Sequence, residues 1–257
     1  MNLRALHQAI NKGGSISVEQ KFLKQLEMTI QEGEGTQKIP STNYKPSSLN
    51  CPRQMFYYRR GTAVDPAPVS PSLVGVVQSG TDRHIRIQKA IMAMRKFGYD
   101  CQYIDVAAFI KKFKPAGTEV VGKRGAETKC YNSIYDMSFM CDGILRIGKE
   151  YYILEIKTES TFKFTNRFGV DEKHYPQASS YSLLLGLDKV IFLYENRDIC
   201  TKKAFLLVVT EKMRQEIKDK LNLVEDCVKK NILPQPCRND KVCLYCAYAA
   251  RCGMNLK

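Results

Sequence analysis

The 257-residue sequence lacks the features that would direct a chain into or across a membrane. No apolar run approaches the roughly 20 residues that a transmembrane helix requires. The N-terminal stretch "MNLRALHQAINKGG" has neither an apolar core of signal-peptide length nor a small-residue cleavage site. Without an export signal, the ten cysteines do not predict a disulfide framework. We therefore expect a soluble, cytoplasmic protein.

Acidic residues are in the minority. The chain has 26 Asp and Glu against 40 Lys and Arg, which gives a formal net charge of +14 spread along the sequence. This balance favours a polyanionic partner, most simply nucleic acid, although an acidic membrane surface would attract the same charge. Internal repeats are also lacking, and the length and 44% hydrophobic content are enough for one large core, or for one core with a smaller appended part.

The order of sequence patterns predicts an α/β fold with a central mixed sheet flanked by helices. Helical patterns cover residues 72–97, 174–187 and 211–233, and strand patterns cover residues 98–110, 131–147, 151–158, 189–196 and 203–210. A Ser at 47 or 48 is expected to cap a short helix that carries Cys51. We expect a peripheral segment at 1–45, a core at 46–232 and a small cysteine-rich part at 233–257.

The stretch "YYILEIKTES" reads as a buried strand that ends in charged residues. Alternate residues of a strand share a face, so Glu155 and Lys157 are neighbours. A two-residue turn at Gly148 and Lys149 would pair this strand with the preceding one and place Asp142 opposite Glu155. Carboxylates at that separation repel unless a cation or proton lies between them, and a hard divalent ion is the natural occupant.

A simpler interpretation stays open, in which Asp142 caps a turn and Glu155 forms an ordinary ion pair with Lys157. His84 is one of only three histidines and lies on the apolar face of the helix predicted at 72–97, where it is either a core residue or a further ligand for Mg²⁺ or Mn²⁺. Gln177 and Tyr181 are four residues apart on a helix and therefore adjacent, so both could donate hydrogen bonds near a phosphate or near Lys157.

The last cysteines of the chain are grouped differently from the others. Cys243, Cys246 and Cys252 form C-x2-C-x5-C, and the first spacing lets two thiolates converge on a metal centre. A fourth ligand has to come from elsewhere, and the candidates are Cys237 and Cys51. Zinc and an iron–sulfur cluster both accept four thiolates.

Taken in order, these motifs resemble the RecB-type PD-(D/E)XK nucleases. The matching residues are His84, Asp142, the "EIK" of residues 155–157, and "QASSY" from Gln177 to Tyr181. The pattern "CLYCAYAARC", with Cys51 upstream, is similar to the iron–sulfur branch of that superfamily, which includes CRISPR-associated RecB-like exonucleases and AddB-type nuclease domains. One departure is Cys141, where proline is common.

The resemblance implies roles for these residues. It implies a restriction-endonuclease-like core in which His84, Asp142, Glu155 and the backbone carbonyl of Ile156 bind Mg²⁺ or Mn²⁺. Lys157 would be the catalytic lysine, with Gln177 and Tyr181 in the same catalytic site. It also favours a [4Fe–4S] cluster on Cys51, Cys243, Cys246 and Cys252, with Zn²⁺ as the alternative.

The functional prediction is a metal-dependent DNA nuclease. We expect an exonuclease that hydrolyses DNA ends or single strands in replication, recombination or repair, with a helicase or recombination protein as a possible partner. Arg53, Arg59 and Arg60, near Cys51, could contact DNA phosphates, although a solvated basic face would look the same in sequence. The alternative is a catalytically inactive nucleic-acid-binding subunit, but the full set of site residues argues against it. A zinc-stabilised regulatory or membrane-surface protein would explain the charge but not the ordered motifs.

Overall fold

The computed structural model describes residues 17–33, 42–64, 71–124, 127–237, 239–243 and 246–253. The chain divides into two compact units, one of residues 1–38 and 66–80 and the other of residues 39–65 and 81–257. The described part of the first unit includes the helix α2 (Val18–Gly33). Residues 1–16 and 34–41 of the predicted N-terminal segment lie outside the described residues. The boundaries predicted at residues 45 and 232 stay predictions.

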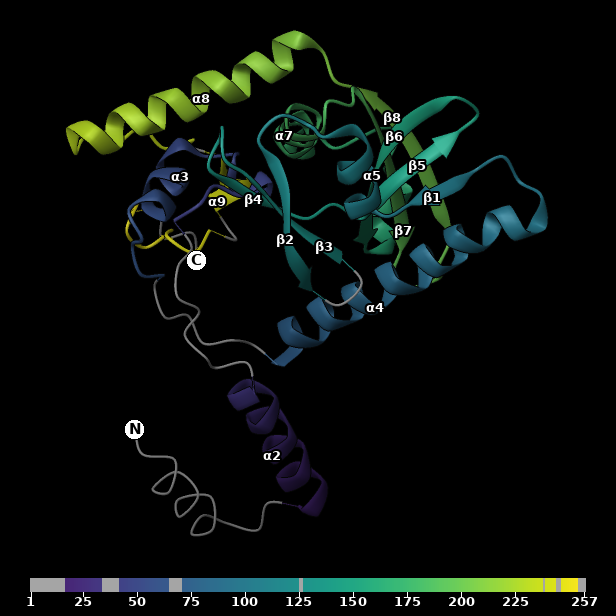
Figure 1. Cartoon of the computed structure of the whole chain (residues 1–257). Coiled ribbons are helices and arrows are strands. Elements are labelled where there is room, and N and C mark those ends of the chain that lie inside the picture. The colour runs from purple at the N-terminus through teal and green to yellow at the C-terminus, as the bar shows by residue number, and fades with distance from the viewer. Residues whose placement is uncertain are drawn as a thin grey trace. The chain divides into compact units, whose positions relative to one another are not determined.

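A mixed five-stranded sheet forms the centre of the second unit (Figure 1). Its order is β1 (Gln102–Ile104), β5 (Gly143–Ile147), β6 (Glu150–Glu159), β7 (Lys189–Asn196) and β8 (Lys202–Val208). Within this sheet β6 and β7 run parallel, because the chain between them passes through α6 (Thr161–Thr165) and α7 (Tyr175–Leu185) before it returns to the sheet. The other neighbouring pairs are antiparallel.

Helices cover both faces of this sheet. On one face, Ile87 of α4 (Pro71–Ala93) packs against Leu154 and Ile156 of β6. On the other face, alternate residues of β6 and β7 share one apolar core with residues of α7 and α8 (Glu211–Lys230). The α/β fold class predicted from the sequence, with a mixed sheet flanked by helices and cysteines near the C-terminus, is confirmed.

The β5–β6 hairpin has the predicted register. Ile147 pairs with Glu150 across Gly148 and Lys149, and the ladder continues to Gly143 opposite Leu154. Gly148 has a φ of +61°, which favours glycine at the first position of the turn. One further step along the same register brings Asp142 to the level of Glu155.

Two local predictions were wrong. The strand expected at residues 98–110 is confined to β1, and α5 (Val106–Phe113) follows it. Asp105 caps this helix by accepting hydrogen bonds from two backbone N–H groups, and a three-four spacing of apolar residues packs it on the core. Ser48 belongs to a short 3₁₀ turn (Pro46–Ser48), so Cys51, and no serine, precedes α3 (Pro52–Arg59).

A second, antiparallel sheet has three strands: β2 (Thr118–Arg124), β3 (Glu127–Asn132) and β4 (Met137–Phe139). The remaining described elements are the 3₁₀ turns at Met94–Phe97 and Glu172–His174 and the short helix α9 (Asp240–Cys243). Among the helices of the described residues, none is long and apolar enough to cross a membrane.

Candidate active site

Asp142, the residue before β5, is fixed by hydrogen bonds to both its side chain and its backbone. It is 5% exposed, and its Oδ2 accepts a hydrogen bond of 2.6 Å from the backbone N–H of Ile156. Its own carbonyl accepts from Gln88 Nε2 at 2.7 Å and from the Tyr103 hydroxyl at 3.0 Å. Both the backbone and the carboxylate of Asp142 are therefore fixed in place.

Gly143 permits this arrangement. A β-carbon at position 143 would lie 2.3 Å from Cε2 of Tyr103, far inside van der Waals contact. The φ of Gly143 is +149°, a conformation that L-residues with a side chain rarely adopt. The absence of a side chain at 143 therefore lets the Tyr103 ring reach the Asp142 carbonyl.

His84 of α4 contacts the other carboxylate oxygen of Asp142. The distance from His84 Nδ1 to Asp142 Oδ1 is 2.9 Å, and the His84 side chain is 24% exposed. Burial lowers the pKa of His84, but the hydrogen bond to Asp142 and the charges of Asp142 and Glu155 outweigh burial, so the pKa is raised overall. His84 is thus part of a polar site and is no isolated core histidine.

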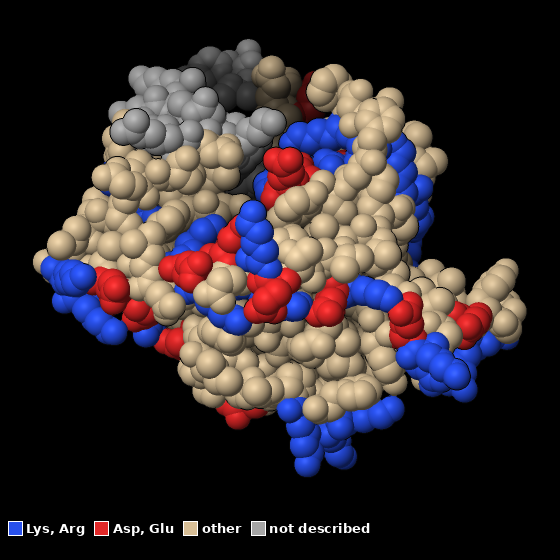
Figure 2. Space-filling view, turned by 90° about the horizontal axis from the view of Figure 1, so that it is seen from above, with Lys and Arg blue, Asp and Glu red and all other residues tan. Residues whose placement is uncertain are grey.

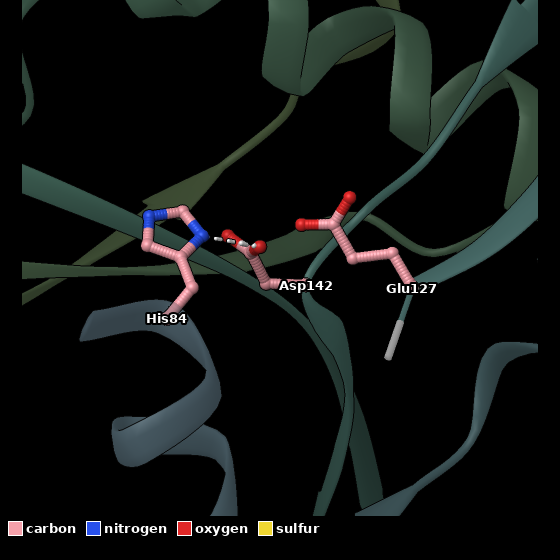
Figure 3. Close-up of side chains that lie close together, drawn as sticks. All are labelled: His84, Glu127 and Asp142. Carbon is pink, nitrogen blue, oxygen red and sulfur yellow. Dashed lines mark hydrogen bonds and ion pairs between the residues drawn. The ribbon is translucent and has the colours of Figure 1, made fainter. Parts of the chain in front are cut away.

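Glu127 is the third member of this group and was not predicted from the sequence. Ligand atoms of His84, Glu127 and Asp142 all lie within 4.8 Å of one another. Figure 3 shows Asp142 between the other two, with His84 on α4 and Glu127 at the start of β3. An imidazole and two carboxylates are ligands that fit Mn²⁺ or Mg²⁺, so these three residues could hold such an ion.

Glu155 and Lys157 form a second group on β6. Glu155 is 5% exposed, and its Oε1 accepts hydrogen bonds from Lys157 Nζ at 2.6 Å and Gln177 Nε2 at 2.7 Å. Gln177 Oε1 accepts from the same ammonium at 3.0 Å. Two acceptors therefore fix the position of the Lys157 ammonium.

Gln177 also connects this group to Tyr181. Gln177 Nε2 donates to the Tyr181 hydroxyl at 2.9 Å, and that hydroxyl donates to the Met140 carbonyl at 2.6 Å. Both residues lie on α7, whose Pro176 occupies the first turn, where a missing N–H costs nothing. The adjacency predicted from the four-residue spacing is present in the structure.

The two groups influence each other electrostatically. Burial raises the pKa of Glu155 to about 7, with Lys157 opposing this shift and the charge of Asp142 adding to it. Glu155 is not among the three residues of the candidate metal group, and its Oε1 is bonded to Lys157 and Gln177. Ile156 bridges the groups through its N–H. Metal ligation by Glu155 and by the Ile156 carbonyl remains a prediction.

The structure gathers five cysteines around the C-terminal part. Cys51 precedes α3 and is 5% exposed, and its Sγ accepts a hydrogen bond of 3.4 Å from the backbone N–H of Cys237. Burial raises the pKa of Cys246 and of Cys252, and the nearby Cys51 and Cys243 thiols raise both further. Burial, with Cys51 and Cys243 adding to it, also raises the pKa of Cys237 to about 12.

Among the described residues, these thiols do not form a group of three or more ligand atoms within 4.8 Å of one another, as His84, Glu127 and Asp142 do, so a metal centre at the cysteines remains a prediction. A bound metal stabilises thiolates that proximity and burial otherwise disfavour. Tyr248, which is 0% exposed, attaches the segment to α3: its ring packs on Tyr57 and Tyr58, and its hydroxyl donates to the Thr62 carbonyl at 3.0 Å. The cysteine ligands predicted at 51, 243, 246 and 252 therefore lie in one region, together with Cys237.

The three predicted DNA-contacting arginines have different surroundings. Arg59 forms ion pairs with Asp136 and Glu225. Arg53 donates to the Pro234 carbonyl at 2.8 Å, and its charge lowers the pKa of Cys252 against the larger effect of burial. Arg60 is exposed. DNA contact by these residues remains a prediction.

Figure 2 views the second unit from the side of α8. Lys and Arg side chains alternate there with Asp and Glu. Ion pairs such as Lys218 with Glu211 at 3.3 Å contribute to this pattern. The excess of positive charge does not form one continuous patch on this face.

Comparisons with known proteins give a limited result. No family model matches the chain, and a search of curated proteins finds no match. Among solved structures, SSO0001 is similar at 15% identity and a TM-score of 0.45, over 92% of this chain and 98% of that one. An alkaline exonuclease, LHK-Exo from Laribacter hongkongensis, is similar at 10% identity and a TM-score of 0.46, over 79% and 93%. The same enzyme in complex with dAMP is similar at 11% identity and a TM-score of 0.45, over 75% of this chain and 90% of that one.

Proposed function

We propose that the chain is a metal-dependent DNA nuclease of the PD-(D/E)XK type, acting on DNA ends or single strands. The observation that carries the proposal is the position of Asp142. This buried carboxylate contacts His84 on one side and, through the Ile156 N–H, the strand that carries Glu155 and Lys157. A merely structural ion pair on β6 would not need a second, adjacent group with the ligands of a hard cation.

The two groups would have different roles in phosphodiester hydrolysis. His84, Glu127 and Asp142 would hold Mg²⁺ or Mn²⁺. The ion would polarise the phosphate and lower the pKa of the attacking water. Glu155 and Gln177 aim the Lys157 ammonium, which can orient that water or stabilise the negative charge that develops on the phosphate oxygens.

Assays on linear and circular DNA test this proposal. Wild type should degrade linear DNA with Mn²⁺ or Mg²⁺ and leave it intact in EDTA, and a covalently closed circle should survive if the enzyme requires an end. Glu155→Gln and Lys157→Ala should each lose activity. Glu150→Gln and Lys149→Ala are matched controls on the same hairpin, because both residues are exposed. Intact DNA in every wild-type reaction would contradict the proposal and favour an inactive binding subunit.

We also propose that Cys51, Cys243, Cys246 and Cys252 bind a [4Fe–4S] cluster that attaches the C-terminal part to α3. The support is the gathering of these thiols and the buried Tyr248 beside them. Anaerobically purified protein should be brown and contain iron and sulfide. A colourless protein with stoichiometric zinc would contradict the cluster and leave a zinc site.

A further inference from the structure

Two phenylalanine rings extend into solvent just beyond β6. Phe162 lies in α6 and is 79% exposed, and Phe168 lies in the segment after α6 and is 87% exposed. Burying a side chain of this size is worth roughly 1.5–3 kcal/mol, and both rings forgo that stabilisation. They follow directly on the strand that carries Glu155 and Lys157.

The backbone that carries these rings is anchored at both ends. At the start, the Thr161 N–H donates to Asp198 at 2.9 Å. At the end, Lys203 Nζ donates to the carbonyls of Phe164 at 2.9 Å and Arg167 at 3.0 Å. The backbone from which the side chains of Phe162 and Phe168 project is therefore fixed in place.

Arg167 attaches the same segment to β6. Its guanidinium forms two hydrogen bonds with the carboxylate of Glu159, at 2.6 and 2.7 Å, and this pair is largely buried. Glu159 shares a strand face with Glu155 and lies four residues, or about 13 Å, further along β6. The exposed rings are thus attached at the end of the strand that carries the candidate site.

A group of cations lies on the neighbouring strand. Glu195 is 0% exposed and is contacted by Arg83 at 3.0 Å, Arg86 at 2.6 Å and Lys202 at 3.1 Å. Arg86 and Lys202 alone carry two positive charges beside this one carboxylate, so positive charge exceeds negative charge around Glu195. The Arg86 and Lys202 side chains are 51% and 40% exposed, so this surplus reaches solvent.

The cations and the rings belong to one end of the sheet. Glu195 pairs with Thr158 in the parallel register of β6 and β7, one residue beyond Lys157. Arg83 also donates to the Arg197 carbonyl at 2.7 Å, and the next residue, Asp198, is the one that anchors α6. The turn between β7 and β8 therefore connects the two features.

We propose that this surface binds single-stranded DNA and guides it to the site, with the cation group on phosphates and Phe162 and Phe168 stacked on unpaired bases. Exposed positive charge and exposed aromatic rings at one end of the sheet are the chemistry that binds single strands without sequence preference. In a duplex the bases are already stacked on each other, so the rings gain little there. The inference rests on the proposed nuclease function and selects a single strand as its substrate.

Binding in EDTA tests the surface separately from hydrolysis. Fluorescence anisotropy with a labelled thymidine oligonucleotide of about 20 residues would compare wild type with the double variant Phe162→Ala/Phe168→Ala. Stacking is worth about 1–3 kcal/mol per base, so the double variant should bind roughly tenfold or more weakly. Phe162→Tyr/Phe168→Tyr, which keeps both rings, should bind like wild type.

Two controls isolate the stacking contribution. Phe97→Ala removes a ring that is 75% exposed in the 3₁₀ turn after α4 and should leave binding unchanged. An abasic strand of the same length should bind wild type and the double alanine variant equally, because it offers phosphates without bases. Unchanged melting temperatures would confirm that the variants fold.

Three results would overturn the inference. The double alanine variant could bind the thymidine strand as tightly as wild type, or lose affinity equally for the abasic strand. Sedimentation could instead show that DNA-free wild type is a dimer and the double variant a monomer, which would make the surface an interface between copies. Wild type that binds through these rings yet leaves DNA intact with Mn²⁺ would support the surface and contradict the nuclease proposal.

Discussion

Asp142 accepts a hydrogen bond of 2.6 Å from the backbone N–H of Ile156, the residue between Glu155 and Lys157. The other oxygen of the same carboxylate is 2.9 Å from His84 Nδ1. One buried side chain therefore joins α4 to the strand that carries the proposed catalytic lysine. If Asp142 is a metal ligand, a mutation can remove the negative charge of its carboxylate and still keep its hydrogen bond with the Ile156 N–H.

Asp142→Asn should abolish metal binding and leave the fold intact. The amide oxygen can still accept from the Ile156 N–H, but the negative charge that attracts a cation is gone. Wild type should melt at a higher temperature with Mn²⁺ than without it, and Asp142→Asn should melt at the same temperature in both. Asp142→Ala should cost a further 1–3 kcal/mol or so of unfolding free energy, because the Ile156 N–H loses its partner. An equal Mn²⁺ shift in wild type and Asp142→Asn would contradict the assignment.

Mn²⁺ affinity should rise with pH between about 6 and 8. The pKa of His84 is raised by Asp142 against the effect of burial, and burial raises the pKa of Glu155 to about 7. Both groups hold protons at the lower pH. A cation that binds His84 has to displace the proton and the positive charge of its imidazolium, and protonation of Glu155 removes a negative charge that would attract the cation. Affinity should therefore increase by up to about tenfold per pH unit for each proton displaced. Calorimetric titrations in buffers of different ionisation enthalpy would count the released protons, and a pH-independent affinity with no release would count against the site.

Glu155 should contribute a loss of stability to the metal-free protein as the pH rises from about 4.5 to about 7, while His174, whose pKa is lowered by burial to about 3, acts in the opposite direction in every variant. The folded-state pKa of Glu155 is raised above its ordinary value of 4.5, so in this window the folded state binds more protons than the unfolded state. Glu155→Gln, which is neutral at every pH, should reduce this loss. Denaturant titrations in EDTA at several pH values measure it. An identical pH dependence in wild type and Glu155→Gln would show that Glu155 is ionised throughout.

Gly143→Ala should destabilise the fold more than a glycine substitution without a clash. The added β-carbon would meet the Tyr103 ring at 2.3 Å, whereas Gly98, with a φ of +80°, has no atom within 4 Å of that position. Gly98→Ala therefore incurs only the backbone strain, of roughly 1 kcal/mol. Gly143→Ala should add about 1–3 kcal/mol for the overlap. Equal midpoints in urea for the two variants would show that the Tyr103 ring moves aside without cost.

The hairpin half of the site was predictable because its determinants are local. Gly148 fixes the turn, the turn fixes the register, and the register brings Asp142 to the level of Glu155. The spacing of Gln177 and Tyr181 was equally informative, since helix geometry alone makes them adjacent. In each case the relevant residues are close in sequence and their separation is set by one element.

Glu127 could not be found in this way. It lies at the start of a strand in a separate sheet, and its approach to Asp142 depends on how the two sheets pack. The sequence shows only an acidic residue among basic ones. The helix α5 was missed for a related reason: its apolar residues fit a strand as well as a helix, and the Asp105 cap decides between them. The sequence does not show how the two sheets pack, which positions Glu127, and we did not recognise Asp105 as the cap of α5.

Cys51→Ser should lose most of the bound iron, and Cys237→Ser should keep it. Cys237 lies against Cys51 through its backbone N–H, which a serine retains, whereas Cys51 is proposed as a ligand. Cys101→Ser, outside the C-terminal group, is the matched control. Iron and sulfide analysis of anaerobically purified proteins would distinguish them. If Cys51→Ser retained iron and Cys237→Ser lost it, Cys237 would be the cluster ligand and Cys51 would not.

The rate of Mn²⁺-dependent cleavage by Lys157→Ala tests the central claim most directly. The Lys157 ammonium is held by Glu155 and Gln177 at 2.6 and 3.0 Å, so its loss should leave metal binding in place and remove the group that acts on the phosphate. Single-turnover hydrolysis of labelled single-stranded DNA should slow by roughly 100-fold or more in Lys157→Ala and stay at the wild-type rate in Lys149→Ala. Equal rates in the two variants would contradict the assignment of this site as a nuclease active site.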